Sequence, residues 1–257
     1  MAAHHAESSS FINRRHALII PAGVTIQGVI FDLDGTLLDT ESVLDSCIAE
    51  TCLKDFGLIA DAASLHAVRG LKDHGLGGWP STLLARLQPE VWALALKDDT
   101  ALERSESLFT AVDERFAVCA GSTPAMAGAV RVVNSLAKRR IPLAIATSSM
   151  RDAFNVKRVP HEDTIFAHFH SIVCVEDVAP RAKPMPDAFI KAAACLGLNP
   201  SVCIAVEDSI PGVTAALAAG CFVVATPLSA HREAVLTLGA HLVLDSLDDW
   251  DVDSLVF

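Results

Sequence analysis

Short apolar runs that alternate with helical segments constrain the fold of this chain more than any other feature. Beyond residue 121 there are five runs of strand length, at 142–146, 172–175, 202–206, 222–225 and 242–244. The periodicity between these runs predicts helices over 125–139, 187–196 and 211–219. Strands that are apolar on both faces are typical of a parallel sheet covered by helices on both sides. We therefore predict an α/β core with a doubly wound, Rossmann-like parallel sheet.

The first half of the chain is helical in pattern, apart from one early strand that ends at Asp32. The segments that follow this strand predict a helix that is capped by Asp39 or Thr40 and stops near Gly57. Further helices are predicted over 61–69, 82–87, 89–96 and 102–116. A helical domain inserted directly after the first strand accounts for this order. We predict an N-terminal extension of unknown role at 1–22, an α/β catalytic core made of 23–41 and 123–257, and a helical cap at 42–122.

The early strand leads from Asp32 directly into a second acidic residue, Asp34, and then into Gly35. Residues i and i+2 of a strand point to the same side, so both carboxylates face the space beyond the strand. Two carboxylates this close repel each other and attract a cation between them. Because soft ligands are few nearby, a hard cation such as Mg²⁺ fits best. A turn with two solvated acids is the plain alternative, and the apolar run before Asp32 favours the metal site.

Polar groups that complement these acids follow three other strands. Parallel sheets bind ligands beyond the carboxyl ends of their strands. The second strand ends in Thr147 and Ser148, whose hydroxyl and backbone N–H groups suit phosphate oxygens. Lys183 follows the third strand, and Glu207 and Asp208 end the fourth. Each group also has an ordinary interpretation: Thr147 and Ser148 as a helix cap, Lys183 as a solvated lysine, and Glu207 and Asp208 as loop acids. Their joint occurrence at strand ends predicts one phosphate and metal site.

Charge and composition narrow the choice of partner. The chain has 20 Lys and Arg against 31 Asp and Glu, a net charge of -11, which argues against a nucleic acid polymer. No apolar run reaches the roughly 18 residues of a transmembrane helix. The first residues lack a secretory signal, although Arg14 and Arg15 leave an organelle-targeting alternative open. We expect a cytoplasmic monomer with no membrane partner that acts on a small-molecule phosphate ester.

Seven cysteines are scattered along the chain. None belongs to a Cys-x-x-Cys pair, and most stand inside apolar runs. Buried, reduced thiols are the state that this pattern predicts.

The four polar strand ends resemble the motifs of the haloacid dehalogenase-like hydrolases in order and separation. The likeness covers roughly residues 27–245 and rests on Asp32-Leu33-Asp34-Gly35-Thr36, Thr147, Lys183 with Pro184, and Glu207-Asp208. The helical insertion matches the class of this family that has a small α-helical cap. The segments 141–149 and 206–220 look most like the pseudouridine 5'-phosphatase branch.

This resemblance implies a role for each residue of the site. It makes Asp32 the nucleophile, Asp34 the general acid and base, and Thr147 and Lys183 catalytic groups. The implied phosphate-binding residues are Thr147, Ser148 and Lys183, and the implied Mg²⁺ ligands are Asp32, Asp34, Asp208 and Glu207. The expected reaction is Mg²⁺-dependent hydrolysis of a small phosphorylated metabolite through an aspartyl-phosphate. A sugar phosphate or a nucleoside monophosphate such as pseudouridine 5'-phosphate fits this expectation.

Two other functions stay open at this point. A catalytically idle relative would only bind a partner, but the complete set of Asp32, Asp34, Lys183 and Asp208 speaks against it. A sugar phosphomutase of the β-phosphoglucomutase type shares these core residues. The resemblance to such mutases places a histidine on the first cap helix, near Leu44, whereas the nearest histidine of the predicted cap is His66. The sequence therefore favours a phosphatase over a mutase.

Overall fold

The computed structural model describes residues 18, 20, 23–69, 71 and 75–255. Apart from residues 18 and 20, the N-terminal extension predicted at 1–22 lies outside the described residues. The chain divides into two compact units. The first, here called the sheet unit, comprises residues up to 37, 126–148 and 163–257. The second, the helical unit, comprises 38–125 and 149–162.

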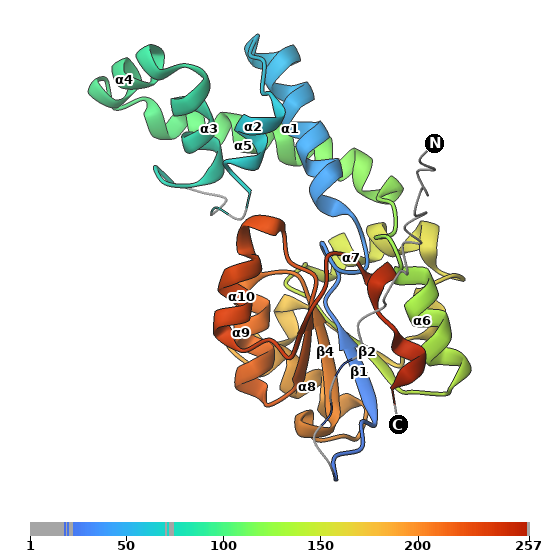
Figure 1. The fold of residues 1–257 in the computed structure, drawn as a ribbon. Helices are drawn as coiled ribbons and strands as arrows, with labels where there is room; N and C mark the ends of the chain where they lie inside the picture. Colours follow the sequence, from blue (N-terminus) through green and yellow to red (C-terminus); the bar gives the residue numbers. More distant parts are fainter. Residues whose placement is uncertain (1–17, 19, 21–22, 70, 72–74, 256–257) are drawn as a thin grey trace, which may run out of the picture. The chain divides into compact units, whose positions relative to one another are not determined.

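A parallel sheet of six strands forms the centre of the sheet unit (Figure 1). Its strands are β1 (Gly28–Phe31), β2 (Leu143–Ala146), β3 (Ser171–Val173), β4 (Cys203–Glu207), β5 (Phe222–Ala225) and β6 (Leu242–Val243). They lie in the order β3-β2-β1-β4-β5-β6, and every pair is parallel. The predicted Rossmann-like class is confirmed. Because β1 pairs with both β2 and β4, the carboxyl ends of these three strands lie side by side.

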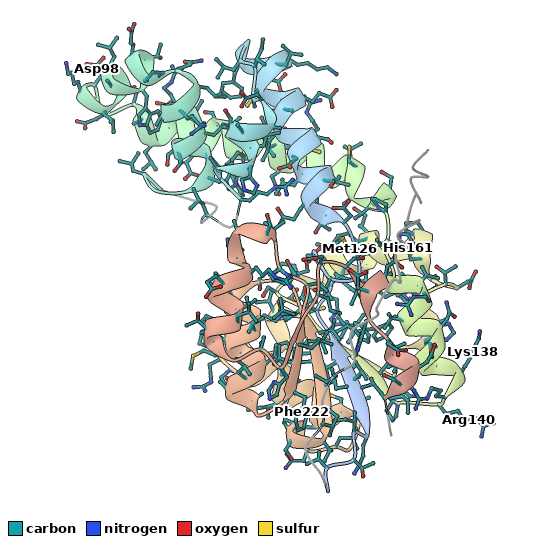
Figure 2. All side chains as sticks on the ribbon, viewed as in Figure 1. Asp98, Met126, Lys138, Arg140, His161 and Phe222 are labelled. Carbon is teal, nitrogen blue, oxygen red and sulfur yellow. The ribbon has the colours of Figure 1, made fainter. Side chains whose placement is uncertain are left out.

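Helices cover both faces of this sheet. On one face lie α8 (Asp187–Cys195), α9 (Ile210–Ala219) and α10 (Arg232–Leu238), with α6 (Ala129–Lys138) on the opposite face (Figure 1). Small residues such as Ala192 of α8 and Ala216 of α9 pack on Ile30 and Ala205 of the sheet, and all four are buried. Lys138 and Arg140, at the end of α6, extend away from the unit into solvent (Figure 2). Continuous apolar strands thus occupy a two-sided core, as the sequence pattern predicts.

The C-terminal segment runs along α6 as two short 3-10 helices, η7 (Leu247–Asp249) and η8 (Val252–Ser254). The guanidinium of Arg131 donates to the carbonyl oxygens of Leu247 at 2.6 Å and Trp250 at 3.0 Å. About two turns further on, at the C-cap of α6, Arg139 donates to the carbonyl oxygens of Val252 and Leu255, at 3.1 and 2.5 Å. Two arginines therefore hold this segment against α6 through its carbonyl groups, of which those of Leu247 and Val252 also accept a backbone bond within the 3-10 helices.

Two differences from the predicted helices have local causes. α6 begins at Ala129, and the helix predicted from residue 125 is too long at its start. Gly128 has a φ of 82°, and a Cβ there would lie 2.3 Å from the backbone nitrogen of Asp248. This left-handed residue interrupts the helical pattern. The predictions also miss α10 and α7 (Arg151–Arg158), because α7 is polar in sequence and α10 is only two turns long.

The helical unit contains the helices between β1 and α6, together with α7 and the short helix η2 (Val159–His161). These are α1 (Thr40–Phe56), α2 (Ala62–His66), α3 (Trp79–Leu87), α4 (Pro89–Lys97), α5 (Ala101–Cys119) and η1 (Ala120–Ser122). Asp39 caps α1 by accepting from the Ser42 N–H at 3.2 Å, and Gly57 ends the helix with a φ of 66°. A separate apolar cluster holds the unit together, with Ile48, Leu83 and Leu108 buried in it.

No helix in the described part of the chain is both long and apolar enough to cross a membrane. All seven cysteines are free thiols; Cys195 is exposed and Cys119 is partly exposed, whereas the other five are buried as predicted.

Candidate active site

Asp32 follows the last residue of β1 and lies at the centre of the sheet's carboxyl edge. Its backbone N–H donates to the carbonyl oxygen of Val206 at 2.9 Å, so the pairing of β1 with β4 continues to this residue. The residue is only 6% exposed. Its Oδ1 accepts a hydrogen bond from Nζ of Lys183 at 2.5 Å. The structure therefore brings together two predicted site residues that are far apart in sequence.

Lys183 is held from three sides. Its Nζ donates to Asp32 and, at 2.6 Å, to Oε1 of Glu207. It also lies over the ring of Phe189 on α8, 5.0 Å from the centroid, where a cation is attracted to the aromatic face. Burial alone would lower the pKa of Lys183, but the charges of Asp32 and Glu207 raise it overall. The lysine therefore carries its positive charge at this site.

Glu207, the last residue of β4, is fully buried and uses both carboxylate oxygens. Oε1 accepts from Lys183, and Oε2 accepts from the N–H groups of Asp208 and Ser209, at 2.9 and 2.8 Å, and from the Ser209 hydroxyl at 3.0 Å. The carboxylate lies against Gly212 in the first turn of α9, where an added Cβ would be 1.7 Å from Oε1. These contacts position Lys183 and the turn between β4 and α9. Metal binding by Glu207 stays a prediction.

The turn after β1 lies against Asp208. Gly35 has a φ of 82°, and a Cβ there would be 2.4 Å from Oδ2 of Asp208. The buried Thr36 hydroxyl donates to Oδ1 of the same carboxylate at 3.2 Å. The turn closes with a bond from the Leu37 N–H to the Leu33 carbonyl oxygen at 2.9 Å. Only glycine allows both the left-handed conformation and this close approach.

Thr147 and Ser148 follow β2, the other neighbour of β1. Thr147 is buried, and its N–H donates to the carbonyl oxygen of Val173 at 2.9 Å. Ser148 is exposed and Asp34 is partly exposed. The register of β1 with β2 places these residues beside Asp32 at the same edge of the sheet. Every predicted site residue thus belongs to the carboxyl edge of the sheet unit.

The pKa of Asp32 is raised from 3.8 to about 7. Burial is the main cause, and the charges of Glu207 and Asp34 act in the same direction, against the attraction of Lys183. The pKa of Asp208 is also raised well above its usual value, by burial and by the charges of Glu207 and Asp32. The edge therefore holds more negative charge than the ammonium of Lys183 balances, and a further cation would relieve the repulsion.

Among the described residues, no three His, Cys, Asp or Glu side chains lie close enough together to bind one metal ion. Mg²⁺ does not need such a cluster, because it is commonly held by one or two carboxylates, water molecules and substrate phosphates. Asp32 and Asp208 come from adjacent strand ends and are hard oxygen donors with uncompensated charge. The donor set therefore fits a hard divalent cation.

A family model described as haloacid dehalogenase-like hydrolase matches residues 26–220. This range includes β1, the helical insertion, the Lys183 segment and Glu207 with Asp208. The chain belongs to the haloacid dehalogenase-like hydrolase family.

Relatives of this haloacid dehalogenase-like hydrolase include proteins named for phosphatase activity. It is 33% identical over 228 residues to a probable pseudouridine-5'-phosphatase of Drosophila melanogaster, covering 86% of this chain and 90% of that one. It is 30% identical to hexitol phosphatase A of Escherichia coli, covering 86% and 92%. Against a bifunctional riboflavin kinase/FMN phosphatase of Arabidopsis thaliana it is also 30% identical, but it spans only 53% of that longer protein.

Solved structures of the family share the fold. A HAD family hydrolase from Deinococcus radiodurans, crystallised with bound phosphate and sodium, superposes with a TM-score of 0.68 at 26% identity. The match covers 88% of this haloacid dehalogenase-like hydrolase and 93% of that chain.

Three supporting residues of the site were not predicted from sequence. Phe189 contacts Lys183, Gly212 makes room for Glu207, and Thr36 binds Asp208. Gly212 left a signal, because a glycine in the first turn of a predicted helix costs stability unless a neighbour requires the space. Thr36 also left a signal, because it belongs to the motif that begins at Asp32, although no role was predicted for it. Phe189 left none, since an aromatic residue on an amphipathic helix is common.

Proposed function

We propose that the protein is a Mg²⁺-dependent phosphomonoester hydrolase that acts on a small phosphorylated metabolite through an aspartyl-phosphate. The observation that carries the proposal is the buried Asp32 joined to Lys183 at the end of the central strand, in a member of a hydrolase family. Sugar phosphates and nucleoside monophosphates such as pseudouridine 5'-phosphate are the substrate classes that the named relatives support.

Asp32 is the proposed nucleophile because its carboxylate is held in one orientation at the edge of the sheet. One oxygen is fixed by Lys183, which leaves the other to attack phosphorus in line with the leaving alcohol. Lys183 keeps its ammonium next to the reacting atoms, where it balances charge on the transferring phosphoryl group. Glu207 and Phe189 hold that ammonium in place.

Asp34 is the proposed general acid and base. Its carboxyl group belongs to the turn directly after Asp32, and it is more exposed than Asp32, so that it can reach both the leaving oxygen and the incoming water. Thr147 and Ser148 are the proposed hydrogen-bond donors to the phosphate oxygens, from the neighbouring strand end. These roles follow from position and residue type together.

Asp32 and Asp208 are the residues best placed to hold Mg²⁺, with Asp34 and Glu207 as the further predicted ligands. When bound, the ion supplies positive charge to the phosphate and keeps Asp32 ionised despite its raised pKa. We also propose that the helical unit is the cap of this enzyme, and that the enzyme is a cytoplasmic monomer.

Turnover of p-nitrophenyl phosphate by the purified full chain tests the reaction class. We expect phosphate release with Mg²⁺, none after exhaustive chelation, and inhibition by Ca²⁺, whose looser coordination misplaces the attacking oxygen. A screen of phosphorylated metabolites ranked by kcat/KM then identifies the substrate. Full activity in chelator would contradict the metal assignment, and no turnover of any phosphate ester would contradict the reaction class.

The mutase alternative has a structural counter-argument. A mutase must keep water from the aspartyl-phosphate until its sugar substrate arrives, which requires a residue that withholds the acid and base group. Helix α1 of the helical unit carries no histidine. We therefore expect net phosphate release without a bisphosphate activator. Incubation with β-glucose 1-phosphate and a trace of bisphosphate separates the two, because a mutase would accumulate glucose 6-phosphate faster than free phosphate.

A further inference from the structure

Two cysteines of the helical unit lie near each other on neighbouring helices. Cys47 is on α1, and Cys119 is the last residue of α5. Cys47 is buried in the apolar cluster of the unit, and Cys119 packs against that cluster. Besides burial, Cys119 raises the pKa of the Cys47 thiol, which places the two side chains near each other. This pair of neighbouring thiols has no part in the proposed phosphatase chemistry.

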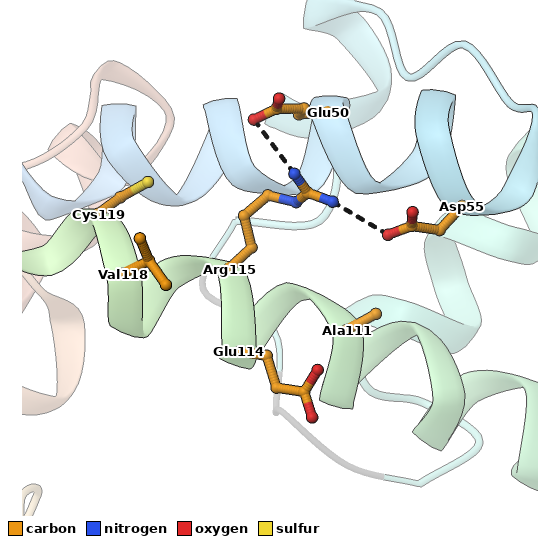
Figure 3. A pocket seen from close by; sticks show the side chains of 7 residues that line it. All are labelled: Glu50, Asp55, Ala111, Glu114, Arg115, Val118 and Cys119. Carbon is orange, nitrogen blue, oxygen red and sulfur yellow. Dashed lines mark hydrogen bonds and ion pairs between the residues drawn. The ribbon is translucent and has the colours of Figure 1, made fainter.

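The register of α1 and α5 accounts for the proximity of the two thiols. Nε of Arg115 on α5 donates to Oγ1 of Thr51 on α1 at 2.9 Å, and its guanidinium contacts Asp55 and Glu50 on either side (Figure 3). The two helices run antiparallel in this view. A step of about one turn forward along α5 and one turn back along α1 therefore leads from Arg115 and Thr51 to Cys119 and Cys47. The hydrogen bond between Arg115 and Thr51 thus sets a register in which Cys119 and Cys47 face each other.

The two thiols differ in their access to small molecules. Cys119 lines an open cavity of about 380 Å³, together with Arg115 and Val118, and its sulfur points toward α1 (Figure 3). Cys47 lies behind it and is only 2% exposed. Burial raises the pKa of the Cys47 thiol to about 11, so this group stays protonated at neutral pH. An oxidant that enters the cavity therefore meets Cys119 first.

We propose that Cys47 and Cys119 form an oxidation-sensitive pair, in which peroxide converts the two thiols into a disulfide that ties the end of α5 to α1. The Cys119 sulfur attacks one peroxide oxygen, the O–O bond breaks, and the leaving hydroxide takes the Cys119 thiol proton and departs as water, so that Cys119 becomes a sulfenic acid. The Cys47 thiol then gives its proton to the sulfenic oxygen as its sulfur attacks the Cys119 sulfur; the S–O bond breaks, and the oxygen leaves as a second water. One peroxide takes up the two electrons that the two thiols lose.

The chain provides its own comparison. Cys203 and Cys221 are also close enough to affect each other, but they are buried in the sheet unit at 0% and 3% exposure. Cys195 is exposed and stands on α8, remote in sequence from the pair. We expect oxidation to link Cys47 with Cys119, to leave Cys203 and Cys221 as thiols, and to join Cys195 only between separate molecules.

The test uses the full-length Cys195→Ser variant, treated with one to two equivalents of hydrogen peroxide under native conditions, then alkylated in denaturant and digested. We expect a cross-linked peptide that contains Cys47 and Cys119, reversal by dithiothreitol, and a higher midpoint of thermal unfolding for the oxidised form. Cys119→Ser in the same background should abolish both the cross-link and the shift. If Cys119→Ser itself lowers stability, the peptide map of the Cys195→Ser chain still decides. Sulfinic acid at Cys119 with Cys47 alkylated would overturn the proposal, and so would recovery of both as free thiols.

Discussion

The ion pair of Asp32 and Lys183 is buried, which makes each of its partners depend on the other. Side-chain exposure is 8% for Asp32 and 5% for Lys183. Removing one member of such a pair leaves an uncompensated charge in a medium that solvates it poorly. Lys183 also donates a hydrogen bond to Glu207, so the three residues act as one unit. The effects of single substitutions there on the free energy of unfolding will therefore not be additive.

Asp32→Asn is the most direct test of the nucleophile. We expect phosphatase activity to fall by about a thousandfold or more, because the amide keeps the shape and can still accept from Lys183 but cannot attack phosphorus. Circular dichroism should show an unchanged fold. The matched control is Asp163→Asn, an exposed acid of the same unit, which should retain full activity. Near-normal turnover in Asp32→Asn would remove Asp32 from its assigned role.

Phe189→Leu tests the aromatic contact of Lys183. Loss of the ring face removes an attraction of about 0.5–2 kcal/mol, and we expect kcat to fall about fivefold with KM little changed. Phe154→Leu serves as the control, because Phe154 is equally buried but belongs to the helical unit, outside the catalytic edge. Steady-state kinetics on an aryl phosphate measure both. Equal losses of kcat in the two variants would mean that the ring only fills space.

Helix α9 begins where the site needs it, and its first turn is shaped by Glu207. Ser209 caps the helix by accepting from the Gly212 N–H at 3.1 Å, and the absence of a side chain at Gly212 admits the carboxylate of Glu207. The helix start, the end of β4 and the lysine are therefore linked through one carboxylate. A substitution in the first turn of α9 should therefore alter the position of Lys183 at the catalytic edge, although the substituted residue does not contact substrate.

The substitution Gly212→Ala tests this contact between Gly212 and the carboxylate of Glu207. The added methyl group would overlap Oε1 of Glu207, so the carboxylate must move and Lys183 loses an acceptor. We expect kcat to fall at least tenfold, and the free energy of unfolding to fall by about 1–3 kcal/mol. Gly77→Ala is the control, because nothing lies within 4 Å of a Cβ at that position and its φ is not left-handed. Urea unfolding and kinetics on both variants check the prediction; a fully active Gly212→Ala would contradict it.

At the scale of elements, sequence patterns predicted the strands better than the helices between them. Runs such as 202–206 are apolar on both faces, and only a covered parallel sheet accommodates them, so β4 was placed within one residue. Helix α7 was not predicted, because Arg151, Asp152 and Lys157 interrupt its apolar pattern. The start of α6 was misplaced because a glycine's close approach to a distant backbone leaves no local trace.

The whole sheet unit gathers charge at one edge, and this sets a dependence of stability on pH. The pKa of Asp32 rises on folding from 3.8 to about 7, and that of Asp208 rises too, so the folded state binds more protons than the unfolded state between about pH 4 and 7. The contribution of these groups to the free energy of unfolding is therefore present below pH 4 and is lost as pH rises through 7.

Urea unfolding between pH 4 and 8 measures this effect. In chelator, we expect the wild-type protein to lose stability relative to Asp32→Asn as pH rises across the window. Above pH 7, Mg²⁺ should raise the free energy of unfolding of the wild-type protein more than that of Asp32→Asn, because a cation that binds only the folded state stabilises it. A wild-type and variant difference that does not change with pH would contradict the raised pKa. An effect of Mg²⁺ that is equal in both proteins would contradict a metal bound through Asp32.

The location of the candidate site was predictable from sequence, but the hydrogen bonds between its side chains were not. Parallel sheets bind ligands at strand ends, which was enough to bring Asp32, Thr147, Lys183 and Asp208 to one edge. Which oxygen of Glu207 binds which donor depends on side-chain contacts between residues far apart in the chain. Patterns in a sequence carry strand and helix periods, whereas they do not carry such contacts.

The strand order has a consequence for how the protein is made. Among the described strands, β1 is synthesised first, yet it lies inside the sheet, and its partners begin only at Leu143 and Cys203. The whole helical insertion is synthesised before either partner exists. Both edges of this apolar strand therefore stay unpaired until β2 is made, and one edge stays unpaired until β4 is made, so that a neighbouring chain can pair with them in the meantime. Yield of soluble protein should thus respond to translation rate and to chaperones that bind nascent chains.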